Sequence, residues 1–433
     1  MLIEFTVGNY TSFKDPATLS LVATKAVSQD KRLDEENVIG DPSGLKLLTS
    51  AAVYGANASG KSNLIEALNF VCSFISVSAR GTRATGGIRV EPFRLSAETV
   101  GRPSYFEIVF TAQDHQYRYG FEVSRERVHR EWLYHVPTVR EARLFERDGD
   151  QITLSGAFKE GRGLEEKTRP NALFLSVVAQ FNGAIARTIT NWFLDMDIFS
   201  GLDDSWLRDT TLGLWDDPEG FSQVTRFIKD LDLSVEDLKL EQDQHMIERY
   251  RSQFPEKFAP GVDWKMPGAY RIKTEHRKFD AAGNPIGTEV FDLDEHESEG
   301  TRKLFALSGT LLGALALGSV VVADEFDARL HPLVTRRLIE LFNSREHNPQ
   351  HAQLIFTTQD TNLLDNRLFR RDQIWFTEKD RFGATHLYSL AEFKGVRNDA
   401  SFEKDYVRGR YGAIPFLGDL GRLAGDGNGE KTA

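Results

Sequence analysis

Gly55-Ala-Asn-Ala-Ser-Gly-Lys-Ser62 matches G-x-x-x-x-G-K-[S/T], the pattern of a glycine-rich loop that binds phosphate. Residues 48–54 before it are mostly apolar and predict a buried strand, and residues 63–71 after it have apolar side chains at helical spacing. A strand, a glycine loop and a helix in this order are the context that such a loop requires. Loop amides and the helix N-terminus would together surround phosphate oxygens.

The residues of this motif have distinct expected roles. Lys61 would reach the β- and γ-phosphates of a nucleotide, and the Ser62 hydroxyl would ligate Mg²⁺. The expected nucleotide-binding residues are Gly55, Ala56, Asn57, Ala58, Ser59, Gly60, Lys61, Ser62 and Asn63.

A second part of a nucleotide site lies far along the chain. Val320-Val-Val-Ala-Asp-Glu325 is an apolar strand that ends in two carboxylates, which is the Walker B pattern. Asp324 would hold Mg²⁺, directly or through water, and Glu325 would orient and deprotonate an attacking water. The alternative is a strand that merely ends in solvated acids.

Upstream of this strand, Glu297-Ser-Glu-Gly300 opens a helix expected over residues 300–317. A Ser-x-Gly sequence at a helix N-terminus can bind an anion or can be an ordinary cap. Its place shortly before the Walker B strand favours anion binding by Ser298 and Gly300.

Composition bounds the function. Of 433 residues, 40% are hydrophobic and 27% are charged, as in ordinary globular proteins. Lys and Arg number 53 against 64 Asp and Glu, and a net charge of −11 does not suit a protein that coats nucleic acid by charge alone. The single cysteine, Cys72, excludes an internal disulfide framework and suits the cytosol.

Two features bear on membranes. Residues 1–7 contain an early acid and no basic segment, so we expect no signal peptide. Residues 304–323 are uncharged and long enough to span a bilayer, but three glycines interrupt them and they lead into Asp324-Glu325. We therefore expect a buried helix and strand there.

The chain divides into four expected parts. Residues 1–154 contain the phosphate loop and, from residue 88, short strand-like runs that predict an antiparallel meander. Residues 155–265 form an inserted helical subdomain with helices over 172–196 and 218–231 and no sustained heptad repeat. Residues 266–424 begin with a β-hairpin and then alternate helices and strands, including a helix over 361–369. Residues 425–433 are expected to be a disordered tail.

The motifs together resemble ABC-type ATPases of the SMC-like branch. More narrowly, residues 1–416 resemble the compact bacterial AAA/ABC ATPases encoded in abortive-infection and related anti-phage operons. The segments that carry the narrower resemblance are Asn9-Tyr-Thr-Ser-Phe13, Pro92-Phe-Arg-Leu95, Tyr117-Arg-Tyr-Gly-Phe121, Glu131-Trp-Leu-Tyr134, Thr357-Thr-Gln-Asp-Thr-Asn-Leu-Leu364 and Arg408-Gly-Arg-Tyr-Gly-Ala-Ile-Pro415.

This resemblance implies an α/β fold: an ABC-type P-loop NTPase head with an antiparallel β subdomain and an inserted helical subdomain. It implies a cytoplasmic ATPase that uses ATP and Mg²⁺ and forms a homodimer or higher homo-oligomer through its heads. Ser298 and Gly300 of one subunit would close over the γ-phosphate held by Lys61 of the other. Family members generally work with a nuclease or toxin encoded nearby, so antiviral defence with such a partner is expected.

The chain departs from the family at Gln359, where a histidine usually contacts the γ-phosphate. Glutamine can donate a hydrogen bond but cannot titrate near neutral pH, so we expect slow hydrolysis. The expected catalytic residues are therefore Lys61, Glu325 and Gln359.

Other functions stay open at this point. The chain could be a DNA-repair or DNA-clamping SMC-like ATPase with a DNA contact, or an ATP-bound scaffold that scarcely turns over. A GTPase is disfavoured because the Asn-Lys-x-Asp motif is absent, and an intrinsic nuclease because residues 326–433 are mostly needed for the head. His129 and Glu131 lack the cysteine pair of a deaminase zinc site. A metal site around His296 in the acidic run 292–299 is a weaker alternative to a solvated surface.

Overall fold

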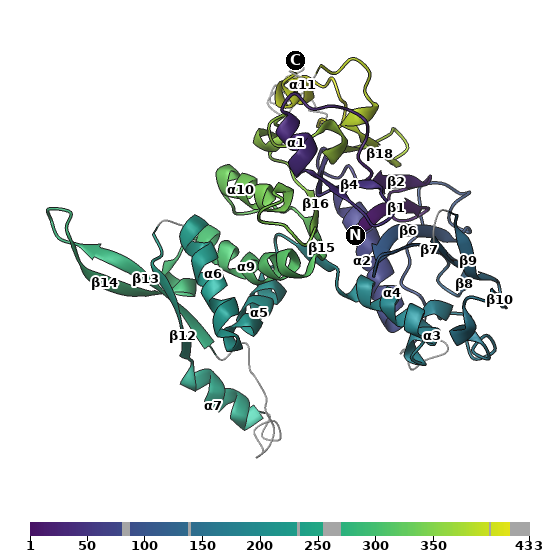
Figure 1. The fold of residues 1–433 in the computed structure, drawn as a ribbon, viewed down its shortest axis with the longest axis horizontal. Helices are drawn as coiled ribbons and strands as arrows, with labels where there is room; N and C mark the ends of the chain where they lie inside the picture. Colours follow the sequence, from purple (N-terminus) through teal and green to yellow (C-terminus); the bar gives the residue numbers. More distant parts are fainter. Residues whose placement is uncertain (80–86, 137–139, 232–233, 254–269, 398–399, 416–433) are drawn as a thin grey trace, which may run out of the picture.

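The computed structural model describes residues 1–79, 87–136, 140–231, 234–253, 270–397 and 400–415 (Figure 1). The expected tail, residues 425–433, and part of the expected helical subdomain lie outside these residues. Two sheets and their helices form the main body, and a β-hairpin projects from it on the left of the view.

A six-stranded sheet carries both sequence motifs. Its order is β11-β15-β16-β5-β17-β18, and the first five strands run parallel while β18 is antiparallel to β17. The strands are β5 (Ser50–Tyr54), β11 (Asp197–Ser200), β15 (Val320–Asp324), β16 (Gln353–Thr357), β17 (Ile374–Lys379) and β18 (Thr385–Ser389). Parallel strands end at one edge, so the segments after β5, β15 and β16 meet there.

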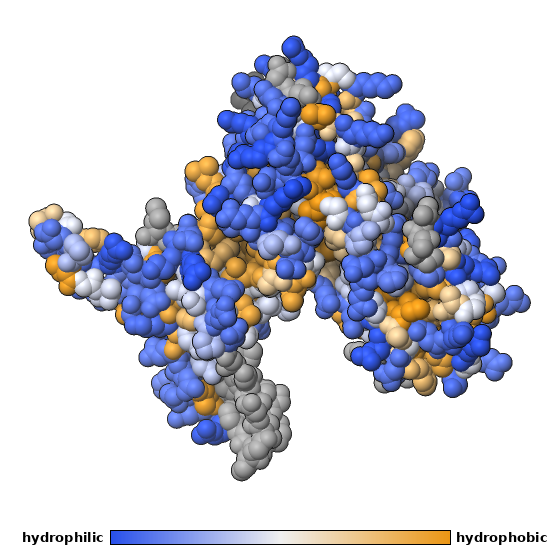
Figure 2. Space-filling model, in the orientation of Figure 1, coloured by the Kyte–Doolittle hydropathy of each residue, from blue (hydrophilic) through white to orange (hydrophobic). Residues whose placement is uncertain are grey.

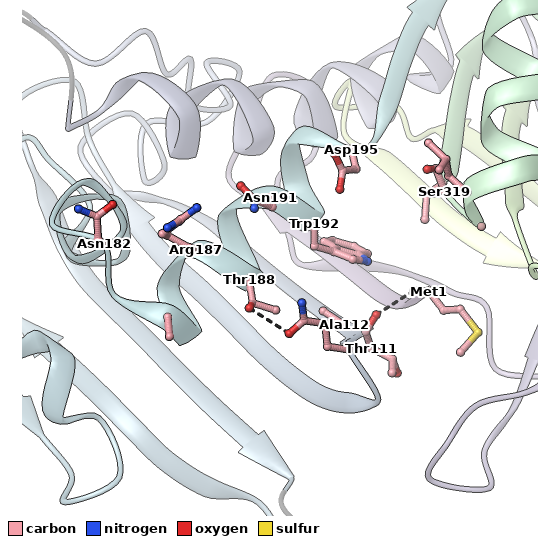
Figure 3. A pocket seen from close by; sticks show the side chains of 15 residues that line it. Met1, Thr111, Ala112, Asn182, Arg187, Thr188, Asn191, Trp192, Asp195 and Ser319 are labelled. Carbon is pink, nitrogen blue, oxygen red and sulfur yellow. Dashed lines mark hydrogen bonds between the residues drawn. The ribbon is translucent and has the colours of Figure 1, made fainter.

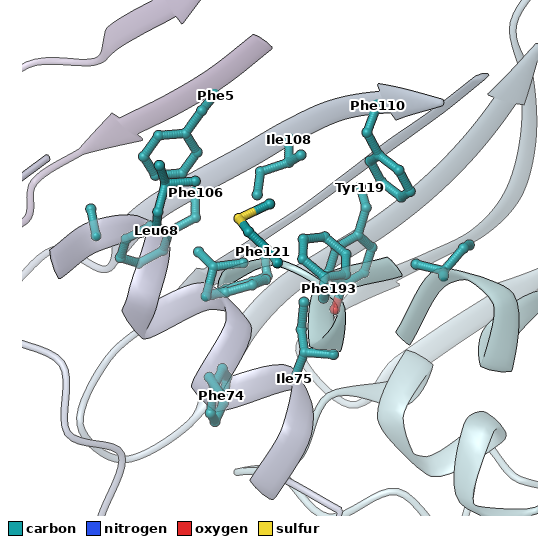
Figure 4. Close-up of a cluster of buried hydrophobic side chains, with 14 of the residues drawn as sticks. Phe5, Leu68, Phe74, Ile75, Phe106, Ile108, Phe110, Tyr119, Phe121 and Phe193 are labelled. Atoms are coloured by element: carbon teal, nitrogen blue, oxygen red, sulfur yellow. The ribbon is translucent and has the colours of Figure 1, made fainter. Parts of the chain in front are cut away.

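The expected antiparallel meander is confirmed from β6 to β10, within a seven-stranded sheet of order β10-β9-β8-β7-β6-β1-β2. It begins at residue 104, and the strand expected soon after residue 88 is wrong, since residues 88–103 form no strand. Its strands are β1 (Leu2–Gly8), β2 (Ala17–Ser20), β6 (Ser104–Ala112), β7 (His115–Val123), β8 (Val128–Val136), β9 (Ala142–Asp148) and β10 (Gln151–Leu154). Aromatic side chains of β6 and β7 alternate toward helix α2 (Lys61–Val77), where Phe106 and Phe121 pack with Leu68 and Phe74 (Figure 4). The phosphate-loop helix therefore lies in a core shared by both sheets.

The helix expected over residues 172–196 is two helices, α3 (Phe174–Gln180) and α4 (Ala184–Leu194). Asn182 takes a φ of 65°, and Gly183 N donates to Val178 O at 3.0 Å. This left-handed residue and its hydrogen bond end α3, and the chain changes direction before α4. The buried residues of α3 and α4 join the core around α2.

The other helices form a second core on the far face of the six-stranded sheet. Its main members are α5 (Ser205–Gly213), α6 (Pro218–Leu231), α9 (Glu299–Leu317) and α10 (Pro332–Asn343). The predicted helical subdomain thus contributes to both cores, and its limits as a domain remain a prediction. Among the described residues, no helix is long and apolar enough to cross a membrane.

The expected hairpin is confirmed in a three-stranded sheet, β12-β13-β14. Its strands are β12 (Asp237–Gln242), β13 (Tyr270–Phe279) and β14 (Pro285–Asp292). Shorter elements complete the fold: α1 (Lys31–Glu36), β3 (Val38–Gly40), β4 (Lys46–Leu48), α7 (Gln244–Gln253), α8 (Leu293–His296) and α11 (Phe402–Val407).

The helix predicted over residues 361–369 is wrong. Only a 3₁₀ turn forms, over Thr361–Leu363, and Leu364 leaves the helical region with a ψ of 68°. Arg336 of α10 donates to the Asp365 carboxylate at 2.8 Å, so a tertiary ion pair holds the chain in a turn there.

Gln353 joins the two large sheets through a buried amide. Its Oε1 accepts from Leu2 N at 2.6 Å, and its Nε2 donates to Leu2 O at 3.0 Å and Leu48 O at 3.1 Å. Leu2 lies in β1 and Leu48 ends β4, so this one fully buried side chain links three segments.

Replacing Gln353 with Leu should lower the free energy of unfolding by about 2–4 kcal/mol, because buried backbone groups lose their partners. Urea denaturation followed by circular dichroism measures this loss. Gln350→Leu, on an exposed position of the turn that precedes β16, is the matched control and should leave stability nearly unchanged. Equal stability of the two variants would contradict the proposed role of the amide.

Candidate nucleotide site

The N-terminus of α2 is shaped to accept an anion. Gly60 precedes the helix with a φ of 111°, and no side chain caps the first turn. A Cβ added at Gly60 would lie 2.3 Å from Thr385 Oγ1, so only glycine fits there. The amides of this first turn therefore remain available for phosphate oxygens, as the motif requires.

Three side chains outside the motif brace the loop. Ser59 Oγ shares a 2.7 Å hydrogen bond with Thr377 Oγ1 of β17. Thr385 Oγ1 of β18 donates to Ser59 O at 2.9 Å, and Asn63 Nδ2 donates to Ser12 Oγ at 2.6 Å. Ser12 belongs to a segment that carried the family resemblance, whereas no sequence signal indicated either threonine.

Lys61 contacts the phosphate loop and lies close enough to the Walker B acids for their charges to affect its pKa. The side chain is buried, and Nζ donates to Gly55 O at 2.7 Å and to Ala56 O at 3.2 Å. Burial lowers the pKa of Lys61, and the carboxylates of Asp324, Glu325 and Asp327 oppose that shift. The structure thus places the predicted cation and the predicted acids close together.

Thr357 contacts both Walker B residues, at the carboxylate of Asp324 and at the backbone amide of Glu325. Its Oγ1, at the end of β16, donates to Asp324 Oδ1 at 2.5 Å and accepts from Glu325 N at 2.8 Å. Glu325 has a φ of 51°, so the chain turns sharply immediately after the strand. Thr357 therefore holds the backbone at the sharp turn between Asp324 and Glu325.

Ser62 and Asp324 line one cavity of about 410 Å³, together with Asp203 and Trp206 of the segment after β11. A hydroxyl and a carboxylate are hard oxygen ligands, and Mg²⁺ normally completes its shell with water and nucleotide phosphates. The residues present therefore fit Mg²⁺. Within the described ranges, no three or more His, Cys, Asp or Glu side chains are grouped to hold a metal, around His296 or elsewhere.

The loop after β11 is a part of the site that the sequence did not indicate. Gly201 N donates to Asp324 O at 2.6 Å, and a Cβ added at Gly201 would lie 2.0 Å from Glu325 O. Lys303 of α9, which is fully buried, donates to Gly201 O at 2.7 Å and to Asp204 Oδ1 at 2.5 Å. Backbone contact and a buried lysine thus connect the Walker B strand to α9.

Ser298 is the N-cap of α9, where its Oγ accepts from Thr301 N at 3.1 Å. Glu297, one residue earlier, accepts from Thr274 Oγ1 at 2.5 Å, and its Oε1 lies 2.6 Å from His276 Nε2. A Cβ on Gly300 would lie 3.4 Å from Arg329 O. Ser298 therefore contacts α9 and Gly300 lies near the segment after β15, while the preceding residue, Glu297, contacts β13.

Gln359 follows β16 and is exposed. Because β16 lies between β15 and β5, Gln359 emerges at the same sheet edge as the loop and the Walker B acids. Its contact with a γ-phosphate stays a prediction.

A second cavity, of about 670 Å³, lies elsewhere in the molecule (Figure 3). Met1, Arg187 and Trp192 line it, along with Ser319 at the amino end of β15. The nucleotide residues lie at the carboxyl end of that strand, so this cavity does not belong to the site.

A phosphate loop and a Walker B strand on a parallel sheet, flanked by an antiparallel sheet, define an ABC-type P-loop NTPase fold. Residues 50–365 match the family described as "AAA domain, putative AbiEii toxin, Type IV TA system". The chain belongs to this family, and the abortive-infection-type resemblance is confirmed. A comparison with curated proteins found no match.

Among solved structures, an Smc head bound to the C-terminal winged-helix domain of ScpA is similar, with 15% identity, a TM-score of 0.44 and coverage of 90% of this chain and 97% of that chain. The SMC head domain from Thermotoga maritima has 14% identity, a TM-score of 0.43 and coverage of 90% and 98%. An Smc head domain from Pyrococcus furiosus has 13% identity, a TM-score of 0.39 and coverage of 94% and 98%.

Replacing Thr357 with Val should weaken Mg²⁺-dependent ATP binding about tenfold or more, because Asp324 loses the hydrogen bond that orients it. Binding in EDTA should be unchanged, since the phosphate loop is untouched. Titration calorimetry with and without Mg²⁺ separates the two. Thr310→Val is the control, because the buried Thr310 hydroxyl has no hydrogen-bond partner in the part of the chain that the structure describes. Equal Mg²⁺ dependence in both variants would contradict the role of Thr357.

Proposed function

We propose that the protein is a Mg²⁺-dependent ATPase that dimerises around ATP and controls a partner nuclease or toxin in anti-phage defence. The observation that carries the ATPase proposal is the convergence of Lys61, Asp324 and Glu325 at one edge of the six-stranded sheet. The family match supports nucleotide binding by the same residues.

Each residue has one chemical task in this proposal. The amides after Gly60 and the Lys61 ammonium bind and orient the phosphates, so the attacked phosphorus is held in place. The Glu325 carboxylate accepts the proton of the attacking water, and the Gln359 amide donates to the γ-phosphate. Ser62 and Asp324 would hold Mg²⁺, which neutralises phosphate charge when it is bound.

Dimerisation is proposed because the resemblance to ABC-type heads implies a nucleotide site that a second subunit completes. Ser298 caps α9 and Gly300 lies near Arg329 in the segment after β15, and in the proposed dimer these two residues would be supplied to the γ-phosphate held by the other subunit. Three large apolar side chains near the site are also exposed: Leu202 by 55%, Trp206 by 48% and Leu333 by 70%. Exposed apolar groups beside a functional site indicate a surface that an assembly covers.

The partner and the biological role rest on the family. Its description names a putative toxin of a type IV toxin–antitoxin system, which supports a role in such a system. A nuclease or toxin partner encoded nearby and action in the cytoplasm are proposed from the resemblance to ATPases of abortive-infection operons. The proposal differs from the two alternatives in measurable ways. A DNA clamp would bind DNA with a strong salt dependence, and a scaffold would bind ATP tightly without releasing phosphate.

Lys61→Ala should weaken ATP binding, since it removes the cation at the phosphates. Glu325→Gln should retain binding but abolish phosphate release, because an amide cannot accept the proton of water. The second variant should also remain dimeric in ATP, since the ligand that closes the dimer is not consumed. Calorimetry, phosphate release and sedimentation with ATP measure these three properties.

The parent protein with and without ATP is the control for these variants. Phosphate release by Glu325→Gln at the parent rate would contradict its role as the base. A monomer in ATP for both the parent and Glu325→Gln would contradict the ATP-closed dimer.

A further inference from the structure

Leu95 and Phe382 are large apolar side chains that lie close together at the surface near β18. Leu95 is 70% exposed and Phe382 62%. A Cβ added at Gly383 would lie 2.5 Å from Leu95 Cδ1, so Leu95 touches the turn between β17 and β18. In Figure 2, apolar atoms lie among hydrophilic ones at the surface around β18. Neighbouring exposed apolar side chains can mark a surface that a ligand covers.

This turn is attached to the phosphate loop. Thr385, which begins β18 three residues after Phe382, donates from Oγ1 to Ser59 O at 2.9 Å. Thr385 N donates to Ser12 O at 2.7 Å, and Ser12 Oγ accepts from Asn63 Nδ2 of α2 at 2.6 Å. The position of Phe382 is therefore set relative to the loop and to the first turn of α2.

The turn that carries Phe382 is also ordered internally. Asp380 Oδ1 accepts from Phe382 N at 2.8 Å and from Ala384 N at 2.9 Å. The guanidinium carbon of Arg381 lies over the Phe382 ring, 4.6 Å from its centroid. One face of the ring is thus covered by its own chain, and the other face is left for a ligand. A side chain that is already in place loses little freedom when it binds.

The order of the strands gives the direction of a bound nucleotide. β15, with the Walker B acids, lies on one side of β5, and β17 and β18 lie on the other. In the proposed function, Glu325 activates the water that attacks the γ-phosphate, so the γ-phosphate lies on the β15 side. Because attack is in line, the leaving β-phosphate points away from that water. The base then emerges on the side of β17 and β18.

We propose that the base of the bound nucleotide lies against Phe382 and Leu95. The free face of the Phe382 ring would stack on the base, and Leu95 would cover its edge by van der Waals contact. This inference rests on the proposed nucleotide site and adds to it the residues that bind the base. Both lie outside the phosphate loop and the Walker B strand.

The contact has a consequence for specificity. A stacking ring and an apolar side chain respond to the area of a base, and they do not read its hydrogen-bonding groups. These two side chains therefore favour a purine over a pyrimidine by size and treat adenine and guanine alike.

Inorganic triphosphate separates base binding from phosphate binding, because it lacks the base. Phe382→Ala in the full chain should weaken ATP binding about tenfold or more and leave binding of Mg²⁺-triphosphate unchanged. Leu95→Ala should have the same effect in smaller degree, and Phe382→Tyr, which keeps the ring, should bind ATP like the parent. Titration calorimetry measures each affinity. Val407→Ala, at a site 61% exposed on α11, is the control and should change neither ligand.

A comparison of nucleotides tests the specificity. The parent should bind GTP within about tenfold of ATP and should bind UTP about fivefold or more weakly than ATP. Phe382→Ala should reduce the difference between ATP and UTP, because the stacking surface is lost. A change in fold alone would weaken all three nucleotides and triphosphate together.

ATP binding at the parent affinity by both Phe382→Ala and Leu95→Ala would overturn the proposal and place the base elsewhere. Equal weakening of ATP and triphosphate would also overturn it, since the residues would then act on the phosphate loop. UTP binding as tight as ATP binding in the parent would contradict recognition by area. These results leave the proposed function standing, whereas a parent that binds neither ATP nor triphosphate would contradict both.

Discussion

Parallel pairing of β5, β16 and β15 is the constraint on which the site depends, because it brings segments about 270 residues apart to one edge. The pairs Val322–Ile355 and Phe356–Ala52 fix the register, so the chain turns after all three strands at a common level. At this level of the sheet, Thr357 Oγ1 donates a hydrogen bond to the Asp324 carboxylate. A slip of one residue would send its hydroxyl to the opposite face and leave the Asp324 carboxylate and the Glu325 amide without this hydrogen-bond partner.

The same edge is connected to α9 through the loop after β11. Gly201 touches the backbone of Asp324 and Glu325, Lys303 reaches Gly201, and Ser298 opens the helix that carries Lys303. A buried lysine that donates to a backbone carbonyl and a carboxylate is costly to separate from them. We therefore infer that the loop after β11 and α9 move as one unit. Such a unit suits a site whose final contacts come from another subunit.

The sequence predicted those parts of the site whose role depends on neighbouring residues in the chain. Gly60, Lys61 and the Walker B acids lie in short motifs whose chemistry is fixed by neighbours in sequence, and the structure places them together. Gln353, Thr357 and Gly201 act through partners far along the chain, so no window of sequence contains their role. The break at Asn182 had a local signal, since Asn-Gly is a turn pair, but apolar periodicity continues across it. The turn after Leu364 had a weaker signal in Asp365, whose carboxylate accepts from Arg367 N at 2.9 Å, and a distant arginine, Arg336, adds an ion pair that no local pattern shows.

The central claim is that a complete ATP site needs two chains, and mixing two inactive variants tests it most directly. Lys61→Ala removes the phosphate-loop half of each site, and Ser298→Arg blocks the α9 half. In a mixed dimer, one site carries both lesions and the other carries neither, so phosphate release should return in part. Mixed dimers that are verified by differential tagging and still release no phosphate would contradict the account and place the whole site within one chain.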